Sequence, residues 1–275
     1  HAKAIVDLLR PAPVGVYCGR MFLAGGVGEA NAVRAIAAAL DAQPLSALIG
    51  PLACGADILF AEAAIERAID LTIVLPFAEE DFIAQSVRSG GEEWLPRYIR
   101  CRDGAAMVHF ASTARYVSDD CQFILGSHTA MGLAKLRARE LETVAIQLAV
   151  VDPEVAARSG AEIAGTNADI ALWRSRGEAT RTIAVADLDR NLHFPPAPKP
   201  PEGTRRGLYA ILFADFAGFS KLGEAELPIF AAEVMGGIGR ILDDFGEAVL
   251  FRNTWGDAVY AIIDDPATAA RIALA

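Results

Sequence analysis

Five prolines fall within residues 194–206 (FPPAPKPPEGTRR), and no other segment constrains the fold of this chain as strongly. Proline lacks a backbone N–H and fixes φ, so a segment this rich in proline forms neither a helix interior nor a central strand. We therefore expect a semi-rigid extended linker. It divides the 275 residues into a first domain, residues 12–193, and a second, residues 207–275. Two domains also agree with the length of the chain.

Strand and helix patterns alternate along the first domain. Apolar runs predict strands over Gly15–Ala24, Leu45–Gly50, Leu71–Phe77, Ala106–Ala111 and Val144–Val151. Helical patterns lie between them over Glu29–Ala42, Ala56–Ile69 and Cys121–Leu141. Short buried strands separated by helices are typical of a parallel sheet covered on both faces. The predicted fold class is α/β, a doubly wound Rossmann-like domain.

Two glycine-bearing turns follow the first two predicted strands. Because ligands of such sheets bind beyond the carboxyl ends of the strands, both turns are candidate ligand loops. Glycine lets the backbone approach a phosphate or a ribose, and the N-terminus of the next helix favours an anion. A tight strand–helix turn without a ligand explains the same glycines. The candidate ligand-binding residues are Gly25, Gly26, Gly28, Cys54, Gly55 and Asp57.

Gly25–Gly28 (GGVG) and Pro51–Asp57 (PLACGAD) resemble the turns of the SLOG superfamily, Rossmann-like domains proposed to bind nucleotides or related small ligands in signalling proteins. The resemblance spans residues 18–150 and implies a sensor for an unidentified small ligand. Phosphoribohydrolases among these relatives carry Pro-Gly-Gly-x-Gly-Thr-x-x-Glu, which is not found in this sequence. A nucleotide-processing hydrolase stays open as an alternative for this domain.

The second domain predicts a strand, a helix, a two-stranded hairpin and a second helix. The first three elements cover Gly207–Ala214, Glu226–Phe245 and the pair Ala248–Arg252 with Ala258–Ile263. Asp265 is the expected N-cap of the last helix, with Pro266 at its first position.

Two aspartates of this domain follow apolar runs. Asp215 lies in Ile211–Leu222 (ILFADFAGFSKL), and Asp257 lies in Asn253–Ala258 (NTWGDA). A carboxylate that leaves a buried strand is costly unless a cation meets it. Two of them on neighbouring strands suggest a divalent-metal site for a triphosphate, because Mg²⁺ takes one or two carboxylates together with phosphate oxygens. Taken singly, either aspartate is equally well explained as a turn residue.

Asp215–Ser220 (DFAGFS) and Asn253–Asp257 (NTWGD) resemble the two metal-binding motifs of the class III nucleotidyl cyclases, the adenylate and guanylate cyclases. The resemblance implies the first half of a ferredoxin-like α+β cyclase domain, truncated at residue 275. It implies conversion of ATP or GTP to a 3′,5′-cyclic nucleotide and pyrophosphate. The implied metal ligands for Mg²⁺ or Mn²⁺ are Asp215, the Phe216 carbonyl and Asp257, and both aspartates are implied to be catalytic.

The same resemblance implies substrate-binding residues: Ala217, Gly218, Phe219, Ser220 and Asn253. Asn253 stands where the family has a lysine or a glutamate that reads the base, so the choice between ATP and GTP stays open. The family's active sites form between two subunits, which implies a homodimer. The departure at Asn253 also leaves open a catalytically inactive interaction module.

Charge and composition narrow the partners. A formal charge of −10 and a pI near 4.9 argue against a nucleic-acid polymer. No uninterrupted apolar stretch approaches roughly 18 residues, so no membrane segment is expected. The four cysteines form no C-x-x-C pair, which favours small buried side chains in a reducing compartment. We expect a cytoplasmic protein without a signal peptide.

Overall fold

The computed structural model describes residues 11–153, 164–196 and 207–275. The chain divides into two compact units, residues 1–204 and 205–275, and each unit is described by itself. Most of the predicted proline-rich linker, residues 197–206, lies outside the described residues.

The first unit is built on a six-stranded parallel sheet with the strand order β4-β3-β2-β1-β5-β6. The chain fills one half of the sheet from β1 to β4 and then returns to the other side of β1 with β5. The strands are β1 (Val14–Gly19), β2 (Ala47–Gly50), β3 (Asp70–Leu75), β4 (Met107–Phe110), β5 (Ala145–Val151) and β6 (Thr180–Ala184).

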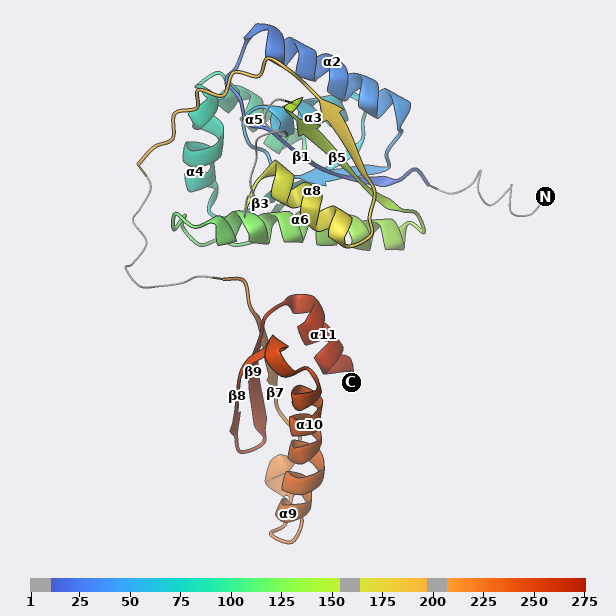
Figure 1. The fold of residues 1–275 in the computed structure, drawn as a ribbon, viewed down its shortest axis with the longest axis vertical. Helices are drawn as coiled ribbons and strands as arrows, with labels where there is room; N and C mark the ends of the chain where they lie inside the picture. The colour runs from blue at the N-terminus through green and yellow to red at the C-terminus, as the bar shows by residue number, and fades with distance from the viewer. Residues whose placement is uncertain (1–10, 154–163, 197–206) are drawn as a thin grey trace, which may run out of the picture. The chain divides into compact units, whose positions relative to one another are not determined.

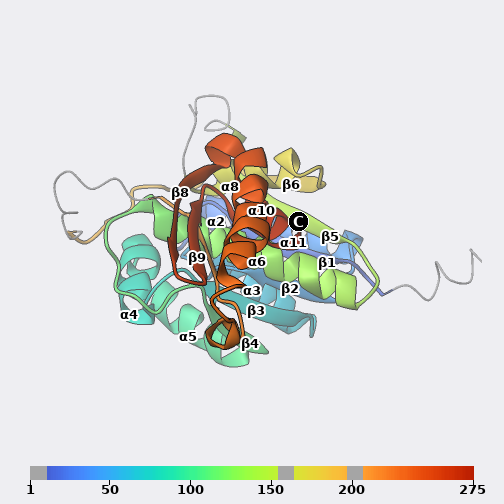
Figure 2. The same cartoon turned by 90° about the horizontal axis from the view of Figure 1, so that it is seen from below.

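Helices cover both faces of this sheet (Figure 1). On one face α2 (Gly26–Ala42), α3 (Ala56–Glu66) and α5 (Trp94–Gly104) share a core with strand residues such as Leu48 and Ile73. On the other face α6 (Asp120–Glu140) and α8 (Thr166–Ser175) pack on Val16 and Ile49. The helix α6 lies along β1, β2 and β3 (Figure 2). The predicted doubly wound, Rossmann-like arrangement is therefore confirmed.

The first strand is shorter than its apolar run predicts. It ends at Gly19, and the next residues form a loop that crosses the start of α3, where the N–H of Ala56 donates to the Arg20 carbonyl (3.1 Å). Phe22 belongs to this loop and is still buried, against Trp94 with ring centroids 5.8 Å apart. Its apolar character therefore reports core packing and not strand structure.

Elements of the first unit that the sequence patterns did not indicate are the short helix α4 (Glu79–Phe82), α5, α8 and β6. The helix α8 contains Trp173, which is fully buried and donates its indole N–H to the Ala179 carbonyl (2.9 Å). This contact ties the end of α8 to the start of β6, which extends the sheet beyond β5.

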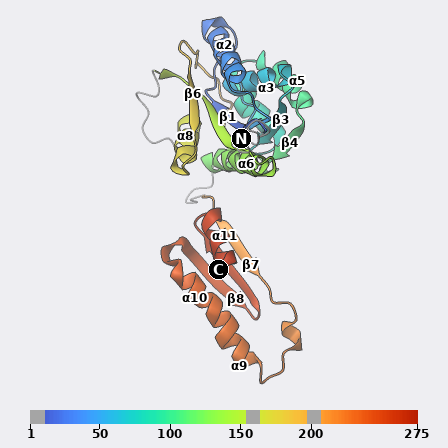
Figure 3. The ribbon, with the colours of Figure 1, turned by 90° about the vertical axis from the view of Figure 1, so that its right-hand side faces the viewer.

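The second unit is a three-stranded antiparallel sheet with the order β7-β9-β8, covered on one face by α10 (Gly236–Asp244) and α11 (Pro266–Leu274) (Figure 3). Its strands are β7 (Ala210–Ala214), β8 (Val249–Trp255) and β9 (Ala258–Ile263). The element order agrees with the prediction, but membership of a cyclase domain does not follow from it.

Two details of the second unit refine the sequence expectations. The predicted helix Glu226–Phe245 is interrupted: α9 (Leu227–Ile229) passes through a π-helical turn, Phe230–Met235, into α10. The Asp265 carboxylate accepts from the N–H groups of Ala267 (2.8 Å) and Thr268 (3.1 Å), which confirms it as the N-cap of α11.

Among the described residues, no helix combines the length and the apolarity needed to cross a bilayer.

Candidate functional site

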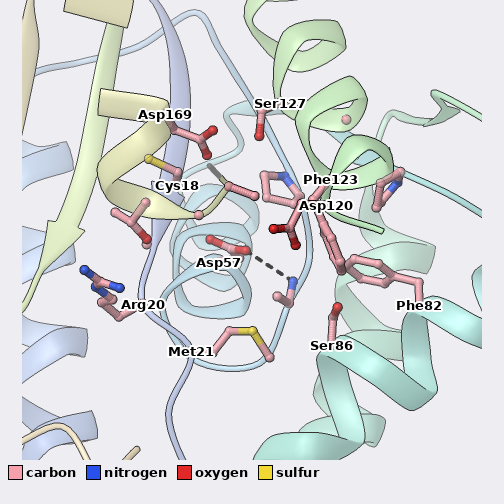
Figure 4. Close-up of a pocket in the computed structure, with 18 of the residues that line it drawn as sticks. Cys18, Arg20, Met21, Asp57, Phe82, Ser86, Asp120, Phe123, Ser127 and Asp169 are labelled. Atoms are coloured by element: carbon pink, nitrogen blue, oxygen red, sulfur yellow. Dashed lines mark hydrogen bonds between the residues drawn. The ribbon is translucent and has the colours of Figure 1, made fainter. Parts of the chain in front are cut away.

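A pocket of about 480 Å³ opens at the carboxyl end of the parallel sheet, beside β1 (Figure 4). Residues after β1, β2 and β3 line it, together with the first turns of α3, α6 and α8. The strand order reverses at β1, whose neighbours are β2 and β5. Ligands of open α/β sheets bind at such a reversal, outside the carboxyl ends of the strands. The pocket is therefore the candidate functional site of the first unit.

Asp57 is the most deeply buried charged group of the pocket, with only 4% of its surface exposed. It lies in the first turn of α3, and its Oδ2 accepts from the Ala53 N–H (3.3 Å). Its Oδ1 has no hydrogen bond of normal geometry among the described residues. Burial raises the pKa of Asp57 well above its ordinary value, and the backbone N–H groups of Ala53 and Gly19 offset this in part.

Asp169 is a second acid of the pocket, on the opposite face of the sheet from α3. It belongs to the first turn of α8, and burial raises the pKa of Asp169 to about 6 although a hydrogen bond with Ser127 acts in the other direction. The charge of Asp169 in turn raises the pKa of Asp57. Figure 4 shows both carboxyl groups directed into the same space.

Cys18 lies beside these two acids, at the end of β1. Burial raises the pKa of the Cys18 thiol well above its ordinary value, and the charges of Asp169 and Asp57 act in the same direction. Its Sγ lies 3.8 Å from Nε2 of Gln147. The thiol therefore stays protonated and lines the pocket as a neutral group. It is not a nucleophile in this form, because the thiolate is the reactive species.

The rest of the lining combines apolar side chains with a few charges. Asp120 stands at the start of α6, and Arg20 follows β1. Arg190 pairs with Asp152 (Nε to Oδ2, 3.5 Å). The apolar and aromatic lining residues include Met21, Phe82, Phe123, Leu192 and Phe194. An apolar enclosure with a few directed polar groups is the usual make-up of a small-molecule site.

The helices that begin at this pocket carry their own acids. Asp57, Asp120 and Asp169 occupy the first turns of α3, α6 and α8, where a negative charge meets the positive end of the helix dipole. At α3, the helix that follows the second glycine turn, the position where an anionic ligand was expected is therefore already taken by the carboxyl group of Asp57.

The glycine turn after β1 is used for packing and does not line the pocket. A Cβ on Gly28 would collide with the backbone carbonyl of Asp187. Gly25 and Gly26 take positive φ values of 87° and 79°. The Gly25 N–H donates to Oε2 of Glu29 (2.5 Å) in the first turn of α2. A side chain thus occupies the helix N-terminus where a phosphate was expected.

In the turn after β2, Cys54 and Gly55 serve packing, whereas Asp57 lines the pocket. Cys54 is buried, its Sγ is 3.9 Å from the Ser89 Oγ, and burial raises the pKa of Cys54 to about 12. Gly55 has φ 89°, and a Cβ there would lie 2.7 Å from the Arg20 carbonyl oxygen. Of the six residues predicted to bind the ligand of the first domain, Asp57 lines the pocket.

In the second unit the strand register brings the two aspartates predicted to bind metal to one end of the sheet. Ala214, just before Asp215, pairs with Val259, two residues after Asp257. Asp215 is exposed and Asp257 is half-buried. The argument that each carboxylate needs a cation because it leaves a buried strand is therefore wrong, since solvent reaches both. Among the described residues, no group of three or more His, Cys, Asp and Glu side chains is arranged to hold a metal.

The loop after Asp215 is anchored by aromatic packing. The rings of Phe216 and Phe219 lie 5.3 Å and 5.0 Å from the ring of Phe230. Gly218 takes φ 90°, and nothing lies within 4 Å of where its Cβ would be. Ala217 and Ser220 are exposed beside it. The backbone of this loop is thus accessible from solvent.

The surroundings of Asn253 differ from those of the two aspartates. Its Oδ1 accepts from the Thr254 N–H (2.9 Å), and it lines a second pocket of about 350 Å³ formed with α10. Neither Asp215 nor Asp257 lines that pocket. The structure therefore gathers Asp215, Phe216 and Asp257 near one another but gives Asn253 different surroundings.

Sequence reasoning missed Cys18, Arg20, Asp120 and Asp169 as pocket residues. A usable signal was present in the aspartates that open helices after strands, because such residues face the carboxyl edge of a parallel sheet. Asp57 was selected instead as part of the glycine-bearing turn Pro51–Asp57, and Asp169 was missed because α8 was not predicted.

The sequence gives few links to known proteins. No protein-family model matches the chain, and no curated protein matches it. Among solved structures, the chain is similar to DNA processing protein A (DprA) from Streptococcus pneumoniae, with 15% identity and a TM-score of 0.24. The match covers 64% of this chain and 60% of the DprA chain, less than two thirds of that structure. A similarity this weak carries no argument about ligand or activity.

These comparisons correct both family resemblances. Since no family model and no curated protein matches any part of the chain, assigning the first domain to the SLOG superfamily and the second to the class III nucleotidyl cyclases is wrong. The motifs have a local explanation. Gly218 (φ 90°) and Gly256 (φ 62°) both occupy the left-handed region, so turn geometry alone selects glycine at these positions. We conclude that the chain joins a Rossmann-like unit with an acidic pocket to a small antiparallel unit.

Proposed function

We propose that the first unit is a binding domain for a small organic ligand of about nucleoside size, and that it acts as a sensor in the cytoplasm. The observation that carries this proposal is the Oδ1 atom of Asp57, which is buried in the pocket and accepts no hydrogen bond of normal geometry from the described residues. An unpaired buried oxygen costs about 1–3 kcal/mol, and a ligand that donates to it recovers that cost.

The size and the walls of the pocket support this function. A volume of about 480 Å³ falls within the range of ligand sites in proteins. Phe123 offers aromatic surface for a flat ring, and Ser127 offers a hydroxyl group for its polar edge. The ligand class that fits is a ring-containing molecule with hydrogen-bond donors.

A ligand panel tests this proposal on the full chain. Calorimetry with nucleosides, nucleotides and aromatic amines is expected to give at least one saturable binder. Ser127→Leu places a larger side chain at the pocket and should weaken that binder by roughly tenfold or more. Ser175→Leu, on the exposed end of the neighbouring helix, should leave it unchanged. Absence of any binder, or equal binding by both variants, would reject the pocket as the site.

The same samples test the hydrolase alternative. Asp57 is the candidate general acid toward a leaving base, because burial raises its pKa and so favours the protonated form. Chromatography of the nucleotide mixtures after incubation would show a freed base if this activity exists. Unchanged nucleotides would leave binding as the function.

For the second unit we propose a divalent-cation site that holds ATP or GTP, supported by the strand register that places Asp215 and Asp257 at one end of the sheet. Hard carboxylate oxygens suit Mg²⁺ or Mn²⁺, and phosphate oxygens would complete the coordination. The metal would neutralise charge on the phosphates. Asp215, Asp257 and the Phe216 carbonyl would hold it, and the exposed loop from Ala217 to Ser220 would offer backbone N–H groups.

Manganese binding separates this proposal from an interaction module without catalysis. Electron paramagnetic resonance should show Mn²⁺ bound to the full chain, with loss of binding in Asp215→Ala and Asp257→Ala. Asp264→Ala removes a carboxylate beyond the carboxyl end of β9 and should retain the metal. A separate assay with ATP or GTP then looks for pyrophosphate and a cyclic product. Unchanged Mn²⁺ binding in both aspartate variants, or none in the parent, would support the module.

We also propose that two copies of the chain associate through the outer face of the second unit's sheet. Ile211, Phe213 and Trp255 are 60–65% exposed on this face. Its strand positions carry no charged side chain among Ile211, Phe213, Phe251, Asn253, Trp255, Ala258, Tyr260 and Ile262. Two such faces meet without repulsion despite the chain's net charge of −10.

Light scattering during size-exclusion chromatography tests the association. The parent chain should elute as a dimer and Phe213→Asp as a monomer. Ile229→Asp changes a side chain that is 62% exposed outside the sheet and should leave the dimer intact. A monomeric parent at high concentration would contradict the proposal.

A further inference from the structure

We propose that Asp57 and Asp169 form a deep subsite for a cationic nitrogen group, an amine or an amidine, on an aromatic ligand. This inference rests on the proposed binding function of the pocket and names the chemistry of its deepest group. The ligand is then an organic cation and not a phosphate or a carboxylate.

The first argument is the hydrogen-bonding capacity left open at the pocket floor. Asp57 is only 4% exposed, and its Oδ1 accepts no hydrogen bond of normal geometry from the described residues. Oδ2 already accepts from the Ala53 N–H. A carboxylate oxygen only accepts, so the group that completes it must donate, and charged N–H donors make the strongest such bonds.

The second argument is electrostatic. Three helices begin at the pocket, and each has an aspartate in its first turn, Asp57, Asp120 and Asp169. These carboxylates already occupy the positions where helix dipoles would stabilise a bound anion. A phosphate at the pocket floor would add like charge to Asp57 and Asp169. A nitrogen cation would relieve their repulsion, because the charge of Asp169 acts on Asp57.

The third argument concerns the body of the ligand. Phe123 lines the pocket with its half-buried ring, on the same helix as Asp120 (Figure 4). Aromatic faces attract organic cations as well as apolar rings. A flat ring that carries a basic nitrogen at one end satisfies the aromatic wall and the acid pair together.

The charged and titratable groups around Asp57 and Asp169 determine which side chain gains or loses a proton when a ligand binds. Asp57 and Asp169 are faced by Tyr17 and Cys18 from β1, Arg20 after β1, Cys54 before α3, Asp120 from α6, and Arg190 at the rim. Burial raises the pKa values of Tyr17, Cys18 and Cys54 well above their ordinary range, so these groups stay neutral near pH 7. The two acids are therefore the groups that exchange protons when a cation binds.

Binding should release a proton. Burial raises the pKa of both acids, to about 6 for Asp169, so the empty pocket holds a proton on the pair at mildly acidic pH, where a free carboxylic acid has already lost its proton. An entering cation favours the ionised carboxylates, and the displaced proton passes to the buffer while no covalent bond of the ligand changes. The apparent affinity for a permanent cation should then rise with pH and level off above the pKa of the pair.

Benzamidine and benzamide are the matched probes, because both carry a benzene ring and differ in the charge of the terminal group. Calorimetry on the full chain should detect benzamidine binding at millimolar concentration and at least roughly tenfold weaker binding of benzamide. Titrations in phosphate and in Tris, whose heats of ionisation differ, should show proton release with benzamidine. Binding should strengthen between pH 5.5 and 7.5 by several-fold.

Two substitutions locate the effect. Asp57→Asn and Asp169→Asn should each weaken benzamidine by roughly tenfold or more and reduce proton release, with little change for benzamide. Asp103→Asn, an exposed acid outside the pocket, should change neither. Circular dichroism verifies the fold of each variant. If Asp57→Asn fails to fold, Asp169→Asn and the comparison of the two buffers still test the cationic subsite.

The outcomes separate this inference from the broader function. If a nucleoside binds in a manner sensitive to Ser127→Leu while benzamidine does not bind, the pocket is a ligand site and the cationic subsite is refuted. Benzamidine binding without proton release, or unaffected by both Asp→Asn variants, refutes it as well. If no probe binds at all, both proposals fall together.

Discussion

Asp57 and Asp169 lie in the first turns of two helices on opposite faces of the sheet, and the charge of Asp169 raises the pKa of Asp57. The two residues are far apart in sequence and meet because α3 follows β2 and α8 follows β5, the two strands that flank β1. Their proximity at the sheet's reversal point sets both the stability and the ligand preference expected of this pocket.

Replacing Asp169 by asparagine should stabilise the protein at neutral pH. Burial raises the pKa of Asp169 from 3.8 to about 6, so between these values the folded state holds a proton that the unfolded state has lost. The free energy of unfolding therefore falls as pH rises through that window. Because Asp169 is only half-buried by surface area, we expect a gain of about 1–3 kcal/mol at pH 7 and little below pH 4.

Urea denaturation of parent and Asp169→Asn from pH 4 to 7.5 measures this difference. Asp103→Asn, exposed and outside the pocket, serves as the control and should follow the parent at every pH. Parallel stability curves for the parent and Asp169→Asn would show that the group titrates normally in the fold.

Gly28→Ala should destabilise the first unit strongly. The added Cβ would meet the Asp187 carbonyl, which is backbone and cannot rotate away. A shift of either segment should cost about 1–3 kcal/mol, as overpacked positions do. Gly132→Ala is the matched control, since it is also in a helix, has open space around it, and should gain up to about 1 kcal/mol from helix propensity. Thermal unfolding of the two variants compares them directly, and an unaltered Gly28→Ala would show that the 187–188 segment is not held there.

Arg97→Gln should weaken the packing of α2, α3 and α5. Arg97 donates to Glu29 (2.6 Å) and Glu62 (2.6 Å), and its guanidinium lies 4.3 Å from the centre of the Trp94 ring. Loss of a half-buried cation that pairs two carboxylates should cost about 1–3 kcal/mol, because Glu29 loses this ion pair and Glu62 keeps only its longer contact with Arg100.

The matched change is Arg100→Gln. Arg100 is 67% exposed and 3.8 Å from Glu62, a surface pair worth less than about 1 kcal/mol. Chemical denaturation at low and high salt distinguishes the two positions. Equal effects at both would mean that the Arg97 contacts are of the ordinary surface kind.

Phe230→Ala should loosen the loop after Asp215 more than it unfolds the second unit. The rings of Phe216 and Phe219 both pack on Phe230, which is half-buried in the π-helical turn. We expect a loss of about 1–3 kcal/mol and faster amide exchange over residues 216–220. Ile229→Ala, at an adjacent side chain that is 62% exposed, should alter exchange little. Protection that is unchanged in Phe230→Ala would show that other contacts hold the loop.

The sequence predicted correctly those helices and caps that depend only on residues close together in the chain. The helix predicted over Cys121–Leu141 is observed as α6, Asp120–Glu140, because neighbouring residues carry its helical pattern. Asp265 was predicted as an N-cap and accepts two backbone N–H groups. Strand β1 was overextended because Phe22 is apolar for a tertiary reason, its contact with Trp94.

Candidate site residues were harder to predict, because the residues that meet in the site are far apart in the sequence. The glycines after β1 have the composition of a ligand loop, yet Gly28 is small because the backbone near Asp187 lies against it. Asp57 was identified from the turn that carries it, whereas Asp169 depends on a helix that no sequence pattern indicated. The premise that Asp215 leaves a buried strand failed because the outer face of that sheet is exposed.

By itself the sequence determined the alternation of strands and helices, and with it a parallel sheet covered on both faces, because apolar periodicity and capping act between neighbours in the chain. Only the tertiary structure decided which acids share a pocket. Burial by several elements at once, and not the residue type, raises the pKa values of Asp57 and Asp169. It also leaves Oδ1 of Asp57 without a hydrogen bond of normal geometry from the described residues. That desolvation exists only when β1, α3 and α8 are assembled.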